Sequence, residues 1–196
     1  MSRPVDFFLD PSCPFTWAAS RWISEVAESG AAAVSWRLMS LGVLNEGQEI
    51  PEQFRAGRVQ AARALRALVA AERTGGNDAV AALYAALGAR LHGAGEPLTD
   101  EVIAAAVAEV GLPGTVAEAV ADEGLDAAVR ASHDEGQAAV GQEVGSPILR
   151  MDGVAWFGPV AAPAPTGAEA ARLFEALTLL AQVPSFSELK TARGEL

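Results

Sequence analysis

The hydrophobic and polar positions near the start of the chain predict a strand, a helix and a second strand. Residues 4–9 form a nearly continuous apolar run, which is typical of a short strand buried on both faces. From Pro14 onward, apolar residues recur at helical spacing, and this predicted helix ends near Gly30. Residues 34–38 alternate apolar with polar side chains, so we expect a second strand there, parallel to the first.

The middle of the chain has a different pattern. From residue 51 to about 141 the alternation expected of strands is absent and the spacing of apolar residues is helical throughout. Gly75 and Gly76 separate the first two predicted helices, and the last helix covers about 125–140. We interpret this segment as an insertion.

Strands return after the helical segment. Residues 147–151 and 154–157 are predicted strands joined by Asp152 and Gly153, a pair that suits a type I′ hairpin because both positions tolerate positive φ. The sequence therefore predicts an antiparallel hairpin at this point.

Two pairs of residues near the C-terminal end predict helix starts. Thr166 with Glu169 has the spacing of a capping box ahead of an amphipathic helix, and Ser185 with Glu188 repeats it ahead of a short terminal helix. The predicted order is β-α-β, a helical insertion, then β-β-α. This order predicts an α/β fold with a thioredoxin-like sheet, in which residues 1–50 and 142–196 form the thioredoxin-like domain and residues 51–141 an inserted helical subdomain.

Composition and charge exclude several classes of function. Of the 196 residues, 51% are hydrophobic, which suits a compact domain. Fourteen Lys and Arg against 25 Asp and Glu give a net charge of −11, so we expect no nucleic-acid partner. No apolar run approaches the roughly 18 residues of a membrane span, and the N-terminal residues lack the core of a signal peptide. We therefore predict a cytoplasmic protein with no membrane partner.

The chain contains a single cysteine, Cys13. This excludes an intrachain disulfide and a multi-cysteine zinc site, and no other metal-ligand cluster or phosphate-binding loop is apparent, so we predict no metal. Cys13 lies where the first strand ends and the first helix begins, a position that favours the thiolate because the helix dipole and the first N–H groups point towards it. The alternative is an inert buried cysteine.

Two further positions belong with Cys13. Thr16 lies one helical turn later, where its hydroxyl either donates to the sulfur or bonds to its own backbone. Ser146 and Pro147 precede a strand, which predicts a strand start, an edge or a cis bond, and the spacing by itself favours the strand start. The two histidines, His92 and His133, show no spacing that pairs them with Cys13, and we expect surface or structural roles for them.

Residues 10–17, the helical insertion and residues 144–147 resemble the DsbA-like branch of the thioredoxin superfamily. That branch also contains the kappa-class glutathione transferases and the 2-hydroxychromene-2-carboxylate isomerases. Other segments look closer still to the cytoplasmic mycothiol-dependent reductases of actinobacteria, nitroreductase-type members included. These segments are residues 20–23, 39–41, 44–46, 51–53 and 153–159.

The resemblance implies roles for individual residues. Cys13 would be the attacking thiol, Pro147 a cis-proline facing it, and the backbone of Ser146 would be free to pair with a bound thiol. The remaining residues of the implied substrate- or thiol-binding surface are Pro14, Phe15, Trp17, Asn45 and Phe54. Without the resemblance, core packing explains the three aromatic residues and a turn explains Asn45 at least as well.

The sequence departs from the two-cysteine pattern of the family at Thr16, which stands where a resolving cysteine would be. What remains is monothiol chemistry, in which an external thiol resolves a mixed disulfide on Cys13. The leading hypothesis is a thiol oxidoreductase that uses a low-molecular-weight thiol, mycothiol, together with a small or aromatic electrophilic or oxidised substrate. The alternatives are a kappa-class-like or isomerase-like enzyme that activates a bound thiol, and a redox-inactive binding module; a homodimer remains open.

Overall fold

The computed structural model describes residues 2–49 and 51–192, and only the backbone of residues 52–54 and 56. The strands are β1 (Arg3–Leu9), β2 (Ala32–Leu38), β3 (Ile148–Met151) and β4 (Val154–Phe157). The helices are α1 (Pro14–Glu28), α2 (Leu41–Leu44), α3 (Glu52–Gly88), α4 (Asp100–Glu109), α5 (Gly114–Glu118), α6 (Asp126–Val140) and α7 (Gly167–Leu180). A π-helical turn, η1 (Ala89–Gly93), follows α3, and two 3-10 turns, η2 (Ala119–Ala121) and η3 (Glu123–Leu125), precede α6.

The four strands form one mixed sheet in the order β2-β1-β3-β4. β1 pairs parallel with β2, whereas β3 is antiparallel to both of its neighbours, β1 and β4. Asp152 and Gly153 have φ values of 52° and 80°, as the predicted hairpin requires. The structure therefore confirms the predicted α/β class and its thioredoxin-like sheet.

Both faces of β1 are covered, as its apolar sequence predicts. Phe7 and Phe8 point to opposite faces and both are fully buried. Phe7 belongs to the main core with α1 and α7, and Trp22 of α1 donates from Nε1 to the carbonyl of Ala170 in α7 at 3.0 Å. Phe8 lies under α6, where a Cβ on Gly136 would come within 2.9 Å of its ring. α6 thus approaches the sheet closely only because residue 136 is glycine.

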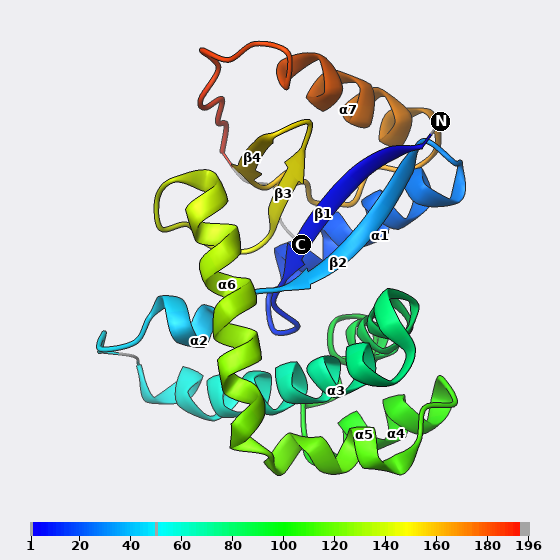
Figure 1. Cartoon of the computed structure of the whole chain (residues 1–196), viewed down its shortest axis with the longest axis vertical. Coiled ribbons are helices and arrows are strands. Elements are labelled where there is room, and N and C mark those ends of the chain that lie inside the picture. The colour runs from blue at the N-terminus through cyan, green and yellow to red at the C-terminus, as the bar shows by residue number, and fades with distance from the viewer. Residues whose placement is uncertain (1, 50, 193–196) are drawn as a thin grey trace.

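The helical insertion packs beside the sheet, and α6 runs from the sheet to the helices α3 and α5 (Figure 1). The predicted break at Gly75 and Gly76 is present as a kink inside α3, where Gly76 has φ 69° and ψ −158°. Directly after the kink, the side chain of Asn77 accepts from Trp36 N–H at 2.7 Å and donates to the carbonyl of Val34 at 2.9 Å. The kink therefore places an amide against the outer edge of β2.

A second side chain protects the same edge. Ser132 of α6 accepts from the N–H of Leu38 at 3.0 Å. β2 is an edge strand, and unpaired backbone groups on such a strand invite pairing with another chain. The insertion thus covers an edge that the four-stranded sheet leaves open.

Of the two helix starts predicted near the C-terminal end, the first is confirmed and the second is wrong. Thr166 is the N-cap of α7, as predicted, but its side chain makes no capping bond, and the N–H of Gly167 donates to the carboxylate of Glu25 in α1. No helix forms at Ser185 within the described residues up to 192. A short helix needs an apolar face to bury, and the side chain of Leu189 is 86% exposed.

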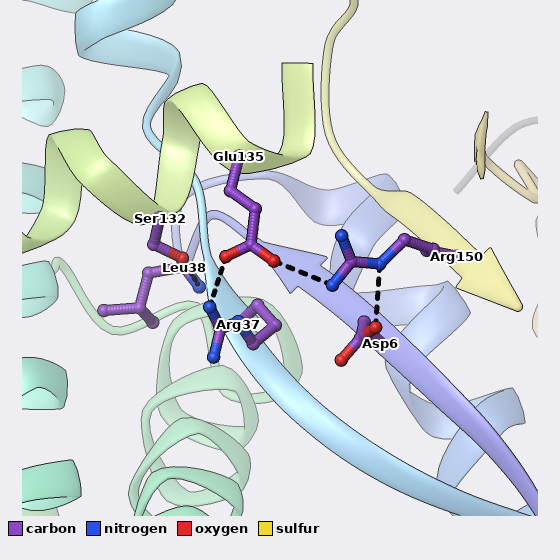
Figure 2. Close-up of polar contacts among 6 residues, drawn as sticks. All are labelled: Asp6, Arg37, Leu38, Ser132, Glu135 and Arg150. Carbon is purple, nitrogen blue, oxygen red and sulfur yellow. Dashed lines mark hydrogen bonds and ion pairs between the residues drawn. The ribbon is translucent and has the colours of Figure 1, made fainter. Parts of the chain in front are cut away.

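A row of charged side chains ties α6 to three strands of the sheet. Glu135 of α6 accepts from Arg37 of β2 and, at 2.7 Å, from Arg150 of β3 (Figure 2). Arg150 also donates from Nε to Asp6 of β1 at 2.8 Å. These hydrogen bonds from Arg150 and Arg37 lower the pKa of Glu135 below its ordinary value of 4.5, although partial burial opposes them.

We expect Glu135→Gln to lower the free energy of unfolding by about 1 kcal/mol near pH 7, because the pair is partly exposed and screened. A carboxyl whose pKa is lowered by folding stabilises the fold above its unfolded pKa, and this contribution is lost as the pH falls through the folded pKa. The difference between the two proteins should therefore shrink as the pH falls below 4.5, as measured by urea unfolding at about pH 7 and about pH 3. The exposed Glu28→Gln is the control. A deficit that is equal at both pH values would contradict an electrostatic role.

Candidate active site around Cys13

The sulfur-bearing residue lies at the corner predicted from the sequence. β1 ends at Leu9, and Cys13 is the N-cap of α1 in an extended conformation, with φ −87° and ψ 114°. Its N–H donates to the carbonyl of Asp10 at 3.2 Å, which closes the turn between strand and helix. Pro14 occupies the first helical position, where its missing N–H costs the helix no hydrogen bond.

The Cys13 side chain faces the loop before β3. Cys13 is 7% exposed, and its thiol donates to the carbonyl of Ser146 at 3.4 Å. The Ser146–Pro147 peptide bond is cis. The sulfur makes no hydrogen bond to the first-turn N–H groups of α1. Because the thiol is bonded to the Ser146 carbonyl, that carbonyl is occupied, unlike the free backbone that the resemblance implies.

Thr16 has a partner that sequence reasoning did not foresee. Its hydroxyl lies 2.6 Å from the hydroxyl of Ser146, and no hydrogen bond joins it to the sulfur or to its own backbone among the described contacts. Ser146 Oγ also accepts from the N–H of Asp10 at 3.2 Å. Both predicted partners of Thr16 are thus wrong, because the loop before Pro147 brings a nearer hydroxyl from 130 residues away.

Asp10 is a buried acid at the start of the turn between β1 and α1, and no role was predicted for it. It is 0% exposed, and its Oδ1 accepts from the N–H and the hydroxyl of Ser12 at 2.8 and 2.6 Å. Its Oδ2 accepts from the N–H of Leu41 at 2.7 Å. Burial raises the pKa of Asp10, while the bonds from Ser12 and Leu41 and the nearby His133 oppose the rise. An aspartate that ends an apolar strand two residues before a serine is the signal that could have identified it.

Both histidines contact the segments around Asp10. His92 Nε2 lies 2.9 Å from the carbonyl of Pro11, and burial lowers the pKa of His92. His133 is 4% exposed, its Nδ1 accepts from the N–H of Ser40 at 3.3 Å, and burial lowers its pKa too. The structural role expected for these residues fits the contacts, whereas a surface position is wrong for His133.

Trp17 packs between α1 and α3. Its ring stacks on His92 with centroids 6.1 Å apart and meets Tyr84 edge-on at 6.2 Å. The guanidinium of Arg21 lies over the ring at 5.4 Å. These contacts match core packing, which was the alternative to a position on the substrate- or thiol-binding surface.

The other residues of the implied binding surface differ in exposure. Pro14 is exposed, whereas Phe15 and Asn45 are half-buried, as Trp17 is. Asn45 is the C-cap of α2, and its Nδ2 donates to the carbonyl of Leu41 at 2.7 Å, as in a turn role. Phe54 lies in α3, but its side chain is outside the described residues.

Two aromatic residues near the site were missed from the sequence. Tyr84 of α3 is 2% exposed, and burial raises its pKa, with the nearby Cys13 and Asp10 adding to the rise. Phe157 of β4 is 37% exposed and lies beside the loop before β3, where a Cβ on Gly145 would be 3.5 Å from its ring. The segment 153–159, which carries part of the resemblance, contains Phe157 and is the signal that could have found it.

The fold therefore brings Cys13, Thr16, Ser146 and Pro147 into one site. Asn45 is linked to this site indirectly, because it donates to Leu41, and Leu41 in turn donates to Asp10. Among the side chains that the structure describes, no three or more metal-ligating ones form a group. Among the helices of these residues, none combines the length and hydropathy of a membrane span.

A sheet of this topology, with an N-cap cysteine facing the loop before a cis-proline, defines a DsbA-like, thioredoxin-type fold. Residues 12–191 match the model of the Rv2466c-like family, described as mycothiol-dependent nitroreductase Rv2466c. The chain belongs to this family.

Other known proteins resemble this chain in sequence or in fold. The chain is 32% identical over 194 residues to the uncharacterized protein Rv2286c of Mycobacterium tuberculosis, a match that covers 97% of this chain and 82% of that protein. Its fold is similar to a 2-hydroxychromene-2-carboxylate isomerase, with a TM-score of 0.64 and 15% identity over 92% of this chain and 95% of the other. It is also similar to the cytosolic disulfide reductase DsbM from Pseudomonas aeruginosa with GSH, with a TM-score of 0.60 and 19% identity over 89% and 99% of the two chains.

We expect Gly88→Ala to lower the free energy of unfolding by about 1–3 kcal/mol, because overpacking forces side chains and backbone to shift. A Cβ at Gly88 of α3 would come within 2.1 Å of the Trp17 ring. Chemical unfolding of Gly88→Ala, Trp17→Leu and the double variant would measure the coupling. Gly57→Ala, in the same helix with nothing within 4 Å of its Cβ, is the control and should not destabilise. Additive effects of the two substitutions would refute the proposed clash.

Proposed function

We propose that this protein is a cytoplasmic monothiol oxidoreductase that exchanges disulfides between Cys13 and a low-molecular-weight thiol, mycothiol. The observation that carries the proposal is the setting of its only cysteine: an N-cap sulfur faces the loop before Pro147, and the hydroxyl of Thr16 stands where a second sulfur would be needed. The family description names mycothiol, which supports the choice of thiol.

The proposed reaction starts with loss of the Cys13 proton to solvent. Deprotonation ends the hydrogen bond to Ser146 and frees its carbonyl, while the N-terminus of α1 favours the sulfur anion. Cys13 Sγ then attacks one sulfur of a disulfide, so that a new S–S bond forms, the old one breaks and the other sulfur leaves as a thiolate. A small thiolate from solution attacks the mixed disulfide and releases Cys13 as the thiolate. The substrate disulfide is thereby exchanged for a mixed disulfide between the half that Cys13 retained and the small thiol, and the other half is released as a thiolate.

The exposed residues near Cys13 fit a bound thiol better than the buried ones do. We assign its binding to Pro14, Phe15, Asn45 and the backbone of Ser146, because these are exposed or half-buried, or are freed when Cys13 ionises. Trp17, although half-buried like Phe15 and Asn45, is not part of this set, because its ring packs on Tyr84 of α3 and on His92 of η1. We propose a small oxidised or electrophilic aromatic substrate, in keeping with the nitroreductase named in the family description and with Phe157 beside the loop.

Incubation with mycothiol disulfide should add the mass of one mycothiol to the wild-type protein and none to Cys13→Ser. Thiol-dependent turnover should fall to background in Cys13→Ser, because the serine hydroxyl is a poor nucleophile at neutral pH. Intact-protein mass spectrometry measures the adduct, and a coupled assay measures the turnover. Ser29→Ala, at the far end of α1, is the control and should behave as the wild type does. Full activity of Cys13→Ser would instead favour the kappa-class-like or isomerase-like alternative, and loss of both adduct and activity in the wild type would favour a binding module.

Thr16→Cys should convert the protein to two-cysteine chemistry. A sulfur at residue 16 is presented to the mixed disulfide at a high effective concentration, so the lifetime of the adduct should fall at least about tenfold. Mass spectrometry after oxidation should find the protein two hydrogens lighter and without an adduct. Thr16→Ser, which keeps the hydroxyl bonded to Ser146, is the matched control and should retain the adduct. A lasting adduct on Thr16→Cys would contradict the assignment of residue 16 as the resolving position.

A further inference from the structure

Asp10 joins three segments that are far apart in the sequence. Its Oδ1 holds Ser12, in the turn that ends at Cys13, through two hydrogen bonds. Its Oδ2 holds Leu41, the first residue of α2, through one. Its own N–H donates to the hydroxyl of Ser146 in the loop before β3.

The three segments are the ones that carry the proposed chemistry. The turn carries Cys13 and the loop carries the backbone of Ser146. α2 is one helical turn long and ends at its C-cap, Asn45, whose side chain donates back to the carbonyl of Leu41. A shift of Leu41 therefore moves Asn45 with it.

We propose that Asp10 is a positioning residue, whose buried carboxylate fixes Cys13 Sγ relative to the two groups assigned to holding the small thiol, Asn45 and the Ser146 backbone. This inference rests on the proposed function for its consequence and on the observed contacts for its geometry. A carboxylate suits the role because both oxygens accept, one for Ser12 and one for Leu41.

An asparagine at residue 10 can accept either from Ser12 or from Leu41, but not from both. An amide has a single accepting oxygen, and its NH₂ group must face either the donors of Ser12 or the N–H of Leu41. A buried N–H opposed by another donor is left unsatisfied, so one segment is released. Asp10→Asn therefore loosens the register between Cys13 and α2 without removing the sulfur.

The test compares two reagents on wild type and Asp10→Asn. Iodoacetamide needs only the sulfur, whereas mycothiol disulfide must also be held beside it. We expect the second-order rate constant with mycothiol disulfide to fall about tenfold or more, as a misplacement near 1 Å can cause. The rate constant for alkylation by iodoacetamide should change less than about threefold. Equal losses with both reagents, or no loss with either, would overturn the proposal.

Asp6→Asn is the matched control. Asp6 lies in β1, the strand that leads to Asp10, and its carboxylate also accepts a hydrogen bond, but from Arg150 on the sheet rather than from the site. We expect Asp6→Asn to react with both reagents as the wild type does. A selective loss with mycothiol disulfide in Asp6→Asn would show that an aspartate outside the site has the same effect, and would overturn the specific role of Asp10.

Hydrogen exchange separates this proposal from the proposed function. In Asp10→Asn the amide of Ser12 or that of Leu41 should exchange at least about tenfold faster than in the wild type, whatever the protein catalyses. If the wild type does not react with mycothiol disulfide, the proposed function fails. The positioning role is then judged by hydrogen exchange alone: faster exchange at either amide of Asp10→Asn supports it, and unchanged exchange at both amides overturns it.

If Asp10→Asn does not fold, Ser12→Ala is the second variant, because it removes one of the three hydrogen bonds to the Asp10 carboxylate. We expect Ser12→Ala to react about threefold more slowly with mycothiol disulfide and at the wild-type rate with iodoacetamide. Wild-type rates in Ser12→Ala would then overturn the proposal.

Discussion

Three hydrogen bonds to Ser146 join the start of α1 to the loop before β3, and the geometry of the site depends on them. The hydroxyl of Ser146 meets Thr16 and the N–H of Asp10, and its carbonyl receives the thiol of Cys13. All four residues are nearly or fully buried, so each bond satisfies a polar group that water cannot reach. The sulfur is thus surrounded by polar groups from two segments that are far apart in the sequence, residues 10–16 and Ser146.

α6 of the insertion supports these polar groups from outside. Gln137 pairs with both the N–H and the carbonyl of Val144, at 2.8 and 2.9 Å, and so fixes the chain two residues before Ser146. One turn earlier, His133 accepts from Ser40, next to the residue that Asp10 holds. Glu135, between these two residues, binds the arginines of β2 and β3. A single helix therefore holds the loop before β3, the start of α2 and the sheet in fixed positions relative to one another.

The sequence was enough to predict the strands, the hairpin, the insertion and the corner at Cys13, because each follows from local periodicity or turn chemistry. It could not predict the partner of Thr16, since the competing hydroxyl of Ser146 is 130 residues away and only the fold brings it near. The same holds for Asp10, whose acceptors serve both a neighbour and the distant Leu41. Local rules also failed at Ser185, where a capping pattern has no apolar surface to pack against.

The hydroxyl at residue 16 has a consequence for how the proposed enzyme turns over. In a two-cysteine protein the second sulfur resolves the mixed disulfide at a rate that is independent of solution thiol. Thr16 is bonded to Ser146 and carries no sulfur, so in the proposed cycle resolution is bimolecular and its rate follows the concentration of the small thiol. With a single cysteine in the chain no internal disulfide competes, so the proposed cycle returns Cys13 to the thiol form whenever that pool is reduced. The proposed cycle thus couples the state of the site to the small-thiol pool rather than to a protein partner.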